Sequence, residues 1–73
     1  MKLREIRSFL GKRVELTTFN ARFVGAVYNV THDDRTGADR IDIADCYKLR
    51  PGKVEYHDTK SLMASTISEV RPL

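Results

Sequence analysis

Carboxylates, imidazoles and one thiol are the side chains of this sequence that could do chemistry, and most of them lie between positions 32 and 58. The aspartates in question are Asp33, Asp34, Asp39, Asp42 and Asp45. Paired carboxylates can perform general acid–base catalysis or hold the metal ions of a nuclease. Here they lie in a polar turn or alternate with apolar strand residues, without a recognisable catalytic spacing. We therefore predict solvated carboxylates and no enzyme activity.

The two histidines and the cysteine give no stronger indication of a reactive site. A metal site needs three or four converging ligands, whereas His32 and His57 are far apart and are expected to be solvated loop residues. A nucleophilic cysteine needs a positioned base, and no motif around Cys46 supplies one, so we expect a structural cysteine. No metal and no cofactor is expected. A single cysteine cannot form an internal disulfide, and it favours a reducing compartment.

The chain is short and moderately basic. Its 73 residues are 41% hydrophobic, and 13 basic against 10 acidic residues give a formal net charge of +3. Such a length allows one domain with a thin core, which association with a partner would help to stabilise. The charge is compatible with nucleic acid, although acidic residues are interspersed. No apolar stretch resembles a signal peptide or a membrane span, which predicts a cytoplasmic or nuclear protein without membrane partners.

A helix followed by short strands is the predicted organisation. Leu3, Ile6, Phe9 and Leu10 share one helical stripe, which predicts a helix over about 2–10 that ends at Gly11. The sequence then predicts strands over about 12–71, within a single domain 1–73 or a fragment of a longer protein. The first of them alternates apolar and polar residues from Val14 to Thr18.

The second predicted strand, 22–30, carries apolar residues on both faces, so we expect it to be central and covered on two sides. Phe23, Gly25 and Val27 fall on one face, whereas Tyr28 and Val30 fall on the other. A glycine in a strand indicates a sharp bend or the close approach of another backbone.

Three more strands follow a polar turn at 32–39. They are predicted from 40, around Leu62–Ala64, and over 67–70, with a turn at 50–53. The fold class is therefore mainly β, with an N-terminal helix and a strongly bent, five-stranded antiparallel sheet that forms a small open barrel.

The order of these features resembles the Sm/LSm family over nearly the whole chain. The first family motif has a hydrophobic residue two before a glycine, another two after it, a third three further on, and a closing hydrophobic alternation. The matching residues are Phe23, Gly25, Val27, Val30, Ile41 and Ile43. In the second motif, hydrophobic residues follow the glycine at intervals of three, which Ile67 and Val70 match.

The departures from the family concern its RNA pocket. RNA-binding members have an acidic residue, an asparagine and an arginine–glycine pair at the positions of Thr31, Arg40, Met63 and Ala64. Stacking of a base on an arginine and its recognition by an amide need those groups. The resemblance therefore implies that the standard uridine pocket is lost. The loop between the second and third strands is also longer than usual, as in the divergent LSm domains of decapping scaffold proteins, Egalitarian-type exonuclease-domain proteins and Gemin subunits.

Edge pairing is the interaction that the sequence favours. In Sm-like proteins the last strands pair with a neighbouring subunit, and strand addition is a general mode of recognition. The segment 62–70 is apolar and lightly charged. We predict a protein interface there, with a protein partner or with a second copy, through Leu62, Met63, Ala64, Ile67 and Val70.

Two alternatives remain open from the sequence. Direct RNA binding would use a basic surface around Arg35, Arg40, Lys48 and Lys53, because phosphate contacts give affinity without sequence information. Tyr47 and Tyr56 could stack on bases, whereas Tyr28 is expected to pack inside. An SH3-like peptide-binding barrel ranks lower, because such grooves need aromatic clusters and the chain has no tryptophan.

Overall fold

A computed structural model describes residues 3–73, and it contains one short helix and five strands around a single core. The elements in chain order are α1 (Leu3–Arg7), β1 (Arg13–Thr18), β2 (Arg22–Asp33), β3 (Ala38–Arg50), β4 (Lys53–Met63), the 3₁₀ turn η1 (Ala64–Thr66) and β5 (Ile67–Pro72). The predicted fold class, an N-terminal helix before a five-stranded antiparallel sheet, is confirmed.

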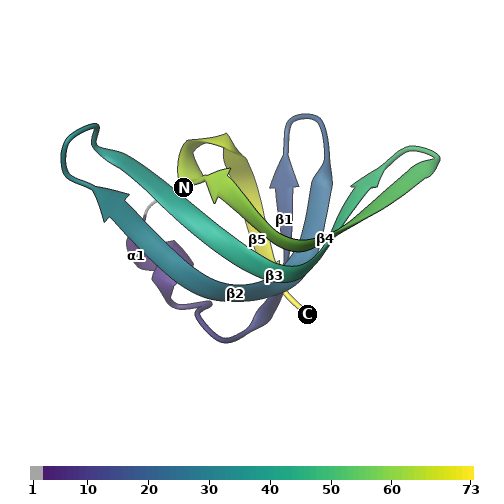
Figure 1. Cartoon of the computed structure of the whole chain (residues 1–73), viewed down its shortest axis with the longest axis horizontal. Coiled ribbons are helices and arrows are strands. Elements are labelled where there is room, and N and C mark those ends of the chain that lie inside the picture. The colour runs from purple at the N-terminus through teal and green to yellow at the C-terminus, as the bar shows by residue number, and fades with distance from the viewer. Residues whose placement is uncertain (1–2) are drawn as a thin grey trace.

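All five strands belong to one sheet, in the order β4-β3-β2-β1-β5. Figure 1 shows β2, β3 and β4 as long strands that curve strongly, so that the sheet wraps around its own concave face. β2 therefore lies in the middle of the sheet, as predicted, and β4 and β5 form its two edges.

The bend of the sheet is located at Gly25. Between Val24 and Ala26 the register of β2 against β3 shifts, so that β3 holds one residue more than β2. In the bulge Asp45 has a φ of 49°, in the left-handed region. A Cβ on Gly25 would lie 3.0 Å from the carbonyl oxygen of Ala44 and 3.4 Å from the Cα of Cys46. Both reasons given for a glycine in this strand, a bend and a close backbone, therefore hold.

The core fills the concave face of the sheet. Its largest fully buried side chains are those of Ile6, Leu16, Ile41, Ile43, Val14, Val27 and Cys46. The inward alternation of β1 and of Ile41 and Ile43 is thus as predicted. Burial raises the pKa of the Cys46 thiol, which agrees with a structural role.

A second bulge in β2 changes which of its residues face the core. The β2–β3 register shifts again between Val27 and Asn29, which leaves Tyr28 as the extra residue. Val30, predicted on the same face as Tyr28 and opposite to Val27, consequently joins Val27 in the core and is 9% exposed. Tyr28, predicted to pack inside, is 53% exposed.

The helix is shorter than predicted. It ends at Arg7 and continues as turns in which Phe9 N–H bonds to the Ile6 carbonyl. The Gly11 N–H instead donates to the Val27 carbonyl at 2.8 Å, because the chain joins the sheet there. Ile6 is buried and Phe9 half-buried, but Leu10 of the predicted stripe is exposed. Residue 2 and the side chain of Leu3 lie outside what the structure describes.

The third and fourth strands are longer than predicted, since β3 runs to Arg50 and β4 begins at Lys53. Only the predicted turn at 50–53 interrupts them. Ala64, predicted in a strand, begins the 3₁₀ turn η1.

Replacing Gly25 by alanine tests the bend. The added methyl group would press on the backbone of β3, so Gly25→Ala should lower the free energy of unfolding by about 1–3 kcal/mol, the usual range for overpacking. Urea denaturation measures this, with Thr59→Ala on exposed β4 expected to stay within about 0.5 kcal/mol. Alanine usually favours strands over glycine, so an unchanged or increased stability would contradict the close approach.

Candidate assembly and RNA-binding surfaces

Two free strand edges are the most extensive unpaired feature of the fold. Within residues 3–73, β4 pairs only with β3 and β5 pairs only with β1. The outer side of each strand therefore presents backbone N–H and C=O groups without a strand partner. Such an edge is a template for another strand, and here two templates stand at opposite ends of one sheet.

The predicted interface residues are divided between the core and the surface. Ala64 and Ile67 are only 2% and 3% exposed, so their side chains stabilise the core. Leu62 and Val70 are half-buried and pack against it. Met63, at the end of β4, is 43% exposed. A partner at this edge would therefore meet mainly backbone groups and Met63.

The positions of the family's RNA pocket do come together. Thr31, Arg40 and Met63 lie opposite one another on β2, β3 and β4, and residues so paired share one face of a sheet. They line an open hollow of about 500 Å³ together with His32, Asp34 and other residues of the β2–β3 turn. The hollow offers the Thr31 hydroxyl, the Arg40 guanidinium and the Met63 thioether where the family has an acid, an amide and an arginine, in that order.

Both histidines lie in strands, so the expectation that they are loop residues was wrong. His32, near the end of β2, is exposed but tied by Nδ1 to Asp39 Oδ1 at 2.5 Å and by Nε2 to Asp34 Oδ1 at 3.4 Å. The hydrogen bond with Asp39 raises the pKa of His32. His57 is half-buried in β4, and its Nε2 lies 3.6 Å from Glu55 Oε2.

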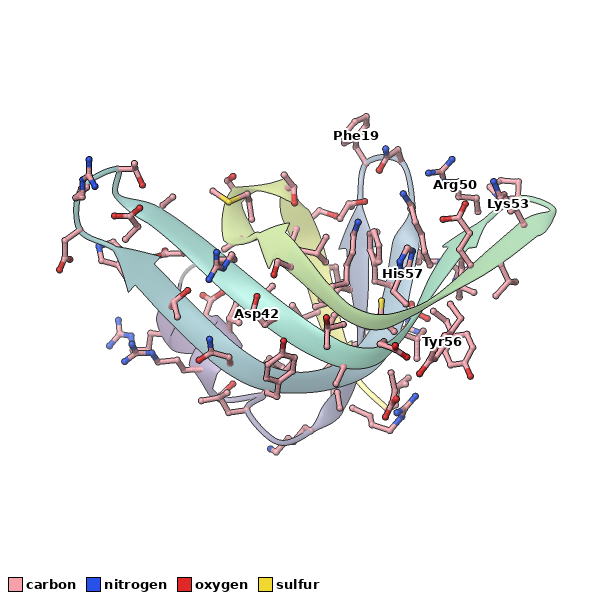
Figure 2. The ribbon with its side chains drawn as sticks, in the orientation of Figure 1. Phe19, Asp42, Arg50, Lys53, Tyr56 and His57 are labelled. Carbon is pink, nitrogen blue, oxygen red and sulfur yellow. The ribbon has the colours of Figure 1, made fainter. Side chains whose placement is uncertain are left out.

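Asp42 is the buried polar residue that sequence reasoning missed. It was predicted to be solvated, but on the outer face of the sheet (Figure 2) it is only 6% exposed. Ser61 Oγ donates to its Oδ1 at 2.5 Å and Asn29 Nδ2 donates to its Oδ2 at 3.0 Å. The Arg40 Nε lies 3.5 Å from Oδ1. The network joins β2, β3 and β4, and predicting it requires the register, because Asn29 and Ser61 flank Asp42 only across the sheet.

The four predicted RNA contacts do not form one surface. Arg35 lies in the β2–β3 turn and Arg40 beside it, at the left end of the molecule in Figure 1. Lys48 and Lys53 lie toward the β3–β4 hairpin at the right end, and the molecule is 38 Å long. Lys53 is in addition paired with Glu55 at 2.9 Å.

The tyrosines form no open stacking platform together. The rings of Tyr47 and Tyr56 meet edge to face, with centroids 5.2 Å apart. The Tyr56 hydroxyl donates to Asp45 at 3.0 Å, which raises its pKa to about 12. The pair therefore braces the outer face next to the bulge.

Two kinds of site find no support in the part of the chain that the structure describes. No three histidine, cysteine, aspartate or glutamate side chains of residues 3–73 are placed to hold a metal ion. No helix among these residues has the length and apolarity that crossing a membrane requires.

Comparisons by sequence give no relative: no model of a known protein family matches, and no curated protein does. Comparison with solved structures finds similar proteins. The Sm protein of Pyrococcus abyssii in complex with a uridine heptamer has a TM-score of 0.73 at 17% identity, over 100% of this chain and 99% of that chain. The chain has the Sm fold. A heptameric archaeal Sm protein has a TM-score of 0.71 at 14% identity, covering 96% of this chain and 97% of its own. The SmAP1 heptamer of P. aerophilum has the same score and identity over 96% of this chain and 89% of that one.

Within this Sm fold, the Asp42 network is expected to stabilise the junction of β2, β3 and β4. Asp42→Asn keeps the shape but sets an amide N–H₂ against one of two donors, so it should cost about 1–3 kcal/mol at neutral pH. Glu69→Gln is the matched control, since this carboxylate on β5 is exposed and has no hydrogen bond or ion pair to the side chains of residues 3–73. Urea denaturation measures both, and equal effects would contradict the role of Asp42.

Protonation of Asp42 is expected to make part of the free energy of unfolding sensitive to acid. Burial acts to raise the pKa of Asp42, but the hydrogen bonds from Ser61 and Asn29 and the charge of Arg40 outweigh it and lower the pKa below 3.8. A carboxyl pKa that is lower in the folded than in the unfolded state stabilises the protein at pH values above the unfolded-state pKa. This stabilisation is lost as the pH falls through the folded-state pKa. Stability of the wild type should therefore fall more steeply below pH 3.8 than that of Asp42→Asn. Parallel pH profiles would contradict the lowered pKa.

Proposed function

We propose that this chain is a non-catalytic Sm-like assembly module of an RNA-processing or RNA-silencing ribonucleoprotein complex. It associates through its open edge strands, with a second copy or with another Sm-like chain. The observation that carries the proposal is the pair of free edges, β4 and β5, at the two ends of a single antiparallel sheet.

The two edges favour head-to-tail association. When β4 of one copy pairs with β5 of the next, the pair still has one free β4 edge and one free β5 edge, and such heterologous contacts give a ring if the rotation closes. Two of the similar Sm structures are heptamers. The core reaches both edges, through Leu62 at β4 and Ile67 at β5, so each edge is held in place for pairing.

Uridine recognition of the family's kind is not part of the proposal. One similar Sm protein is bound to a uridine heptamer, but here Thr31, Arg40 and Met63 stand at the corresponding positions. Ala64, the fourth, is buried. Thr31, Arg40 and Met63 include neither an amide nor an acid. The Arg40 Nε faces Asp42, so its guanidinium plane is not free for a base.

Direct RNA binding is the second candidate function, and the basic end of the molecule near Lys48 favours it. The SH3-like alternative gains no support from the reported similarities, which are to Sm proteins. Salt separates the two remaining candidates, because phosphate contacts weaken steeply with salt whereas strand pairing does not.

Light scattering of the purified chain tests the assembly. We expect a molar mass that is a multiple of 8.4 kDa and that persists in 1 M salt, since backbone pairing and apolar contacts do not depend on charge. A mass of one chain at every accessible concentration would contradict self-association and leave another protein chain as the partner.

A charge at the edge should weaken association. Met63→Lys places a cation on exposed β4, and charged residues on edge strands oppose pairing. We expect the dissociation constant to rise about tenfold or more, equal to about 1.4 kcal/mol, in sedimentation equilibrium. Tyr28→Lys is the control, because Tyr28 is comparably exposed but lies in central β2. Equal weakening by both variants would show that charge acts elsewhere than at the β4 edge.

A further inference from the structure

A single aromatic side chain stands out from the tip of the β1–β2 turn. Phe19, in the β1–β2 turn, is 93% exposed, the most exposed of the large hydrophobic residues described. Figure 2 shows it pointing away from the sheet. The turn beneath it is held firmly, since Thr18 donates to the Ala21 carbonyl with both its N–H and its hydroxyl, each at 2.9 Å. The ring is therefore presented on an ordered turn.

Two hollows flank this ring, and each contains two cations. The first, of about 270 Å³, lies toward the end of β4 and includes Lys48 and Lys60. The second, of about 410 Å³, lies toward the β3–β4 hairpin and includes Arg22 and Arg50. Phe19 belongs to the lining of both, so the ring stands between them.

Most of these cations are free to take a ligand. Among residues 3–73, Lys48, Arg50 and Lys60 make no ion pair, and the Arg22 guanidinium is 3.9 Å from Glu15. The Lys48 amine lies 5.6 Å from the centre of the Phe23 ring, which holds it in the first hollow. Glu55 lies across from Lys48 in the β3–β4 register, but its carboxylate pairs with Lys53 at 2.9 Å.

We propose that the Phe19 turn and its two flanking hollows bind single-stranded RNA, with one base stacked on Phe19 and the neighbouring phosphates on the cations of either side. An exposed aromatic ring between cations is the arrangement by which proteins hold single strands without sequence preference. A purely apolar partner would leave Lys48, Arg50 and Lys60 unused, and an acidic peptide would leave the ring unused. The inference deepens the proposed function and rests on it for the choice of RNA as the ligand.

Fluorescence anisotropy with labelled adenosine and uridine decamers tests the stacking. Phe19→Ala should weaken binding of both about tenfold or more, since loss of base stacking is a large and sequence-tolerant effect. Phe19→Tyr should restore it, because the phenol ring keeps the stacking face. Circular dichroism checks the fold of each variant. Equal affinity of Phe19→Ala and wild type would overturn the proposal.

Salt dependence tests the phosphate contacts. Arg50→Gln and Lys60→Gln should each reduce the slope of log affinity against log salt by about 0.7, the value for one phosphate of a single strand. Lys12→Gln, at the other end of β1 from Phe19, is the matched control and should leave the slope unchanged. An equal effect of all three, or equally tight binding of a polyglutamate peptide, would overturn the proposal.

Light scattering on the same samples separates this inference from the assembly. An assembled protein that binds neither decamer overturns the Phe19 site and leaves the edge pairing intact. A monomer whose binding depends on Phe19 supports the site and contradicts self-association.

Discussion

The close approach of β3 to Gly25 is the constraint on which the rest of the structure depends. With no Cβ in the way, the Ala44 carbonyl and the Cys46 backbone come within contact of β2, and the extra residue of β3 is absorbed by the left-handed Asp45. The sheet can then turn back on itself and enclose a core with only five strands. Because the same sheet closes around the core without pairing its ends, β4 and β5 remain open.

Sequence reasoning succeeded where a residue's role follows from its neighbours in the chain. The alternation of Val14 and Leu16, the turn at 50–53 and the glycine in β2 each have a local signature. It failed where the role depends on a strand across the sheet. The bulge at Tyr28 returns Val30 to the core, and a one-residue shift of this kind reverses the faces of all that follows.

The candidate surfaces show the same division. Met63 could be placed at an edge from the sequence, but Ala64 and Ile67 turn inward, which is decided by the 3₁₀ turn between β4 and β5. Four basic residues were predicted to form one surface, yet the β2–β3 turn and the β3–β4 hairpin carry Arg35 and Lys53 to opposite ends. Phe19 was not singled out from the sequence, and only its exposure between two cationic hollows distinguishes it.

In the proposed function, the small sheet pairs with other strands at its two edges and binds RNA at the Phe19 turn. Hydrogen exchange resolved by residue tests the edge pairing most directly, measured on concentrated and on dilute protein. We expect the outward N–H groups of β4 and β5 to exchange more slowly in the concentrated sample, while those of the β2–β3 turn are unchanged. Equal exchange of the edge amides at both concentrations would contradict the edge pairing.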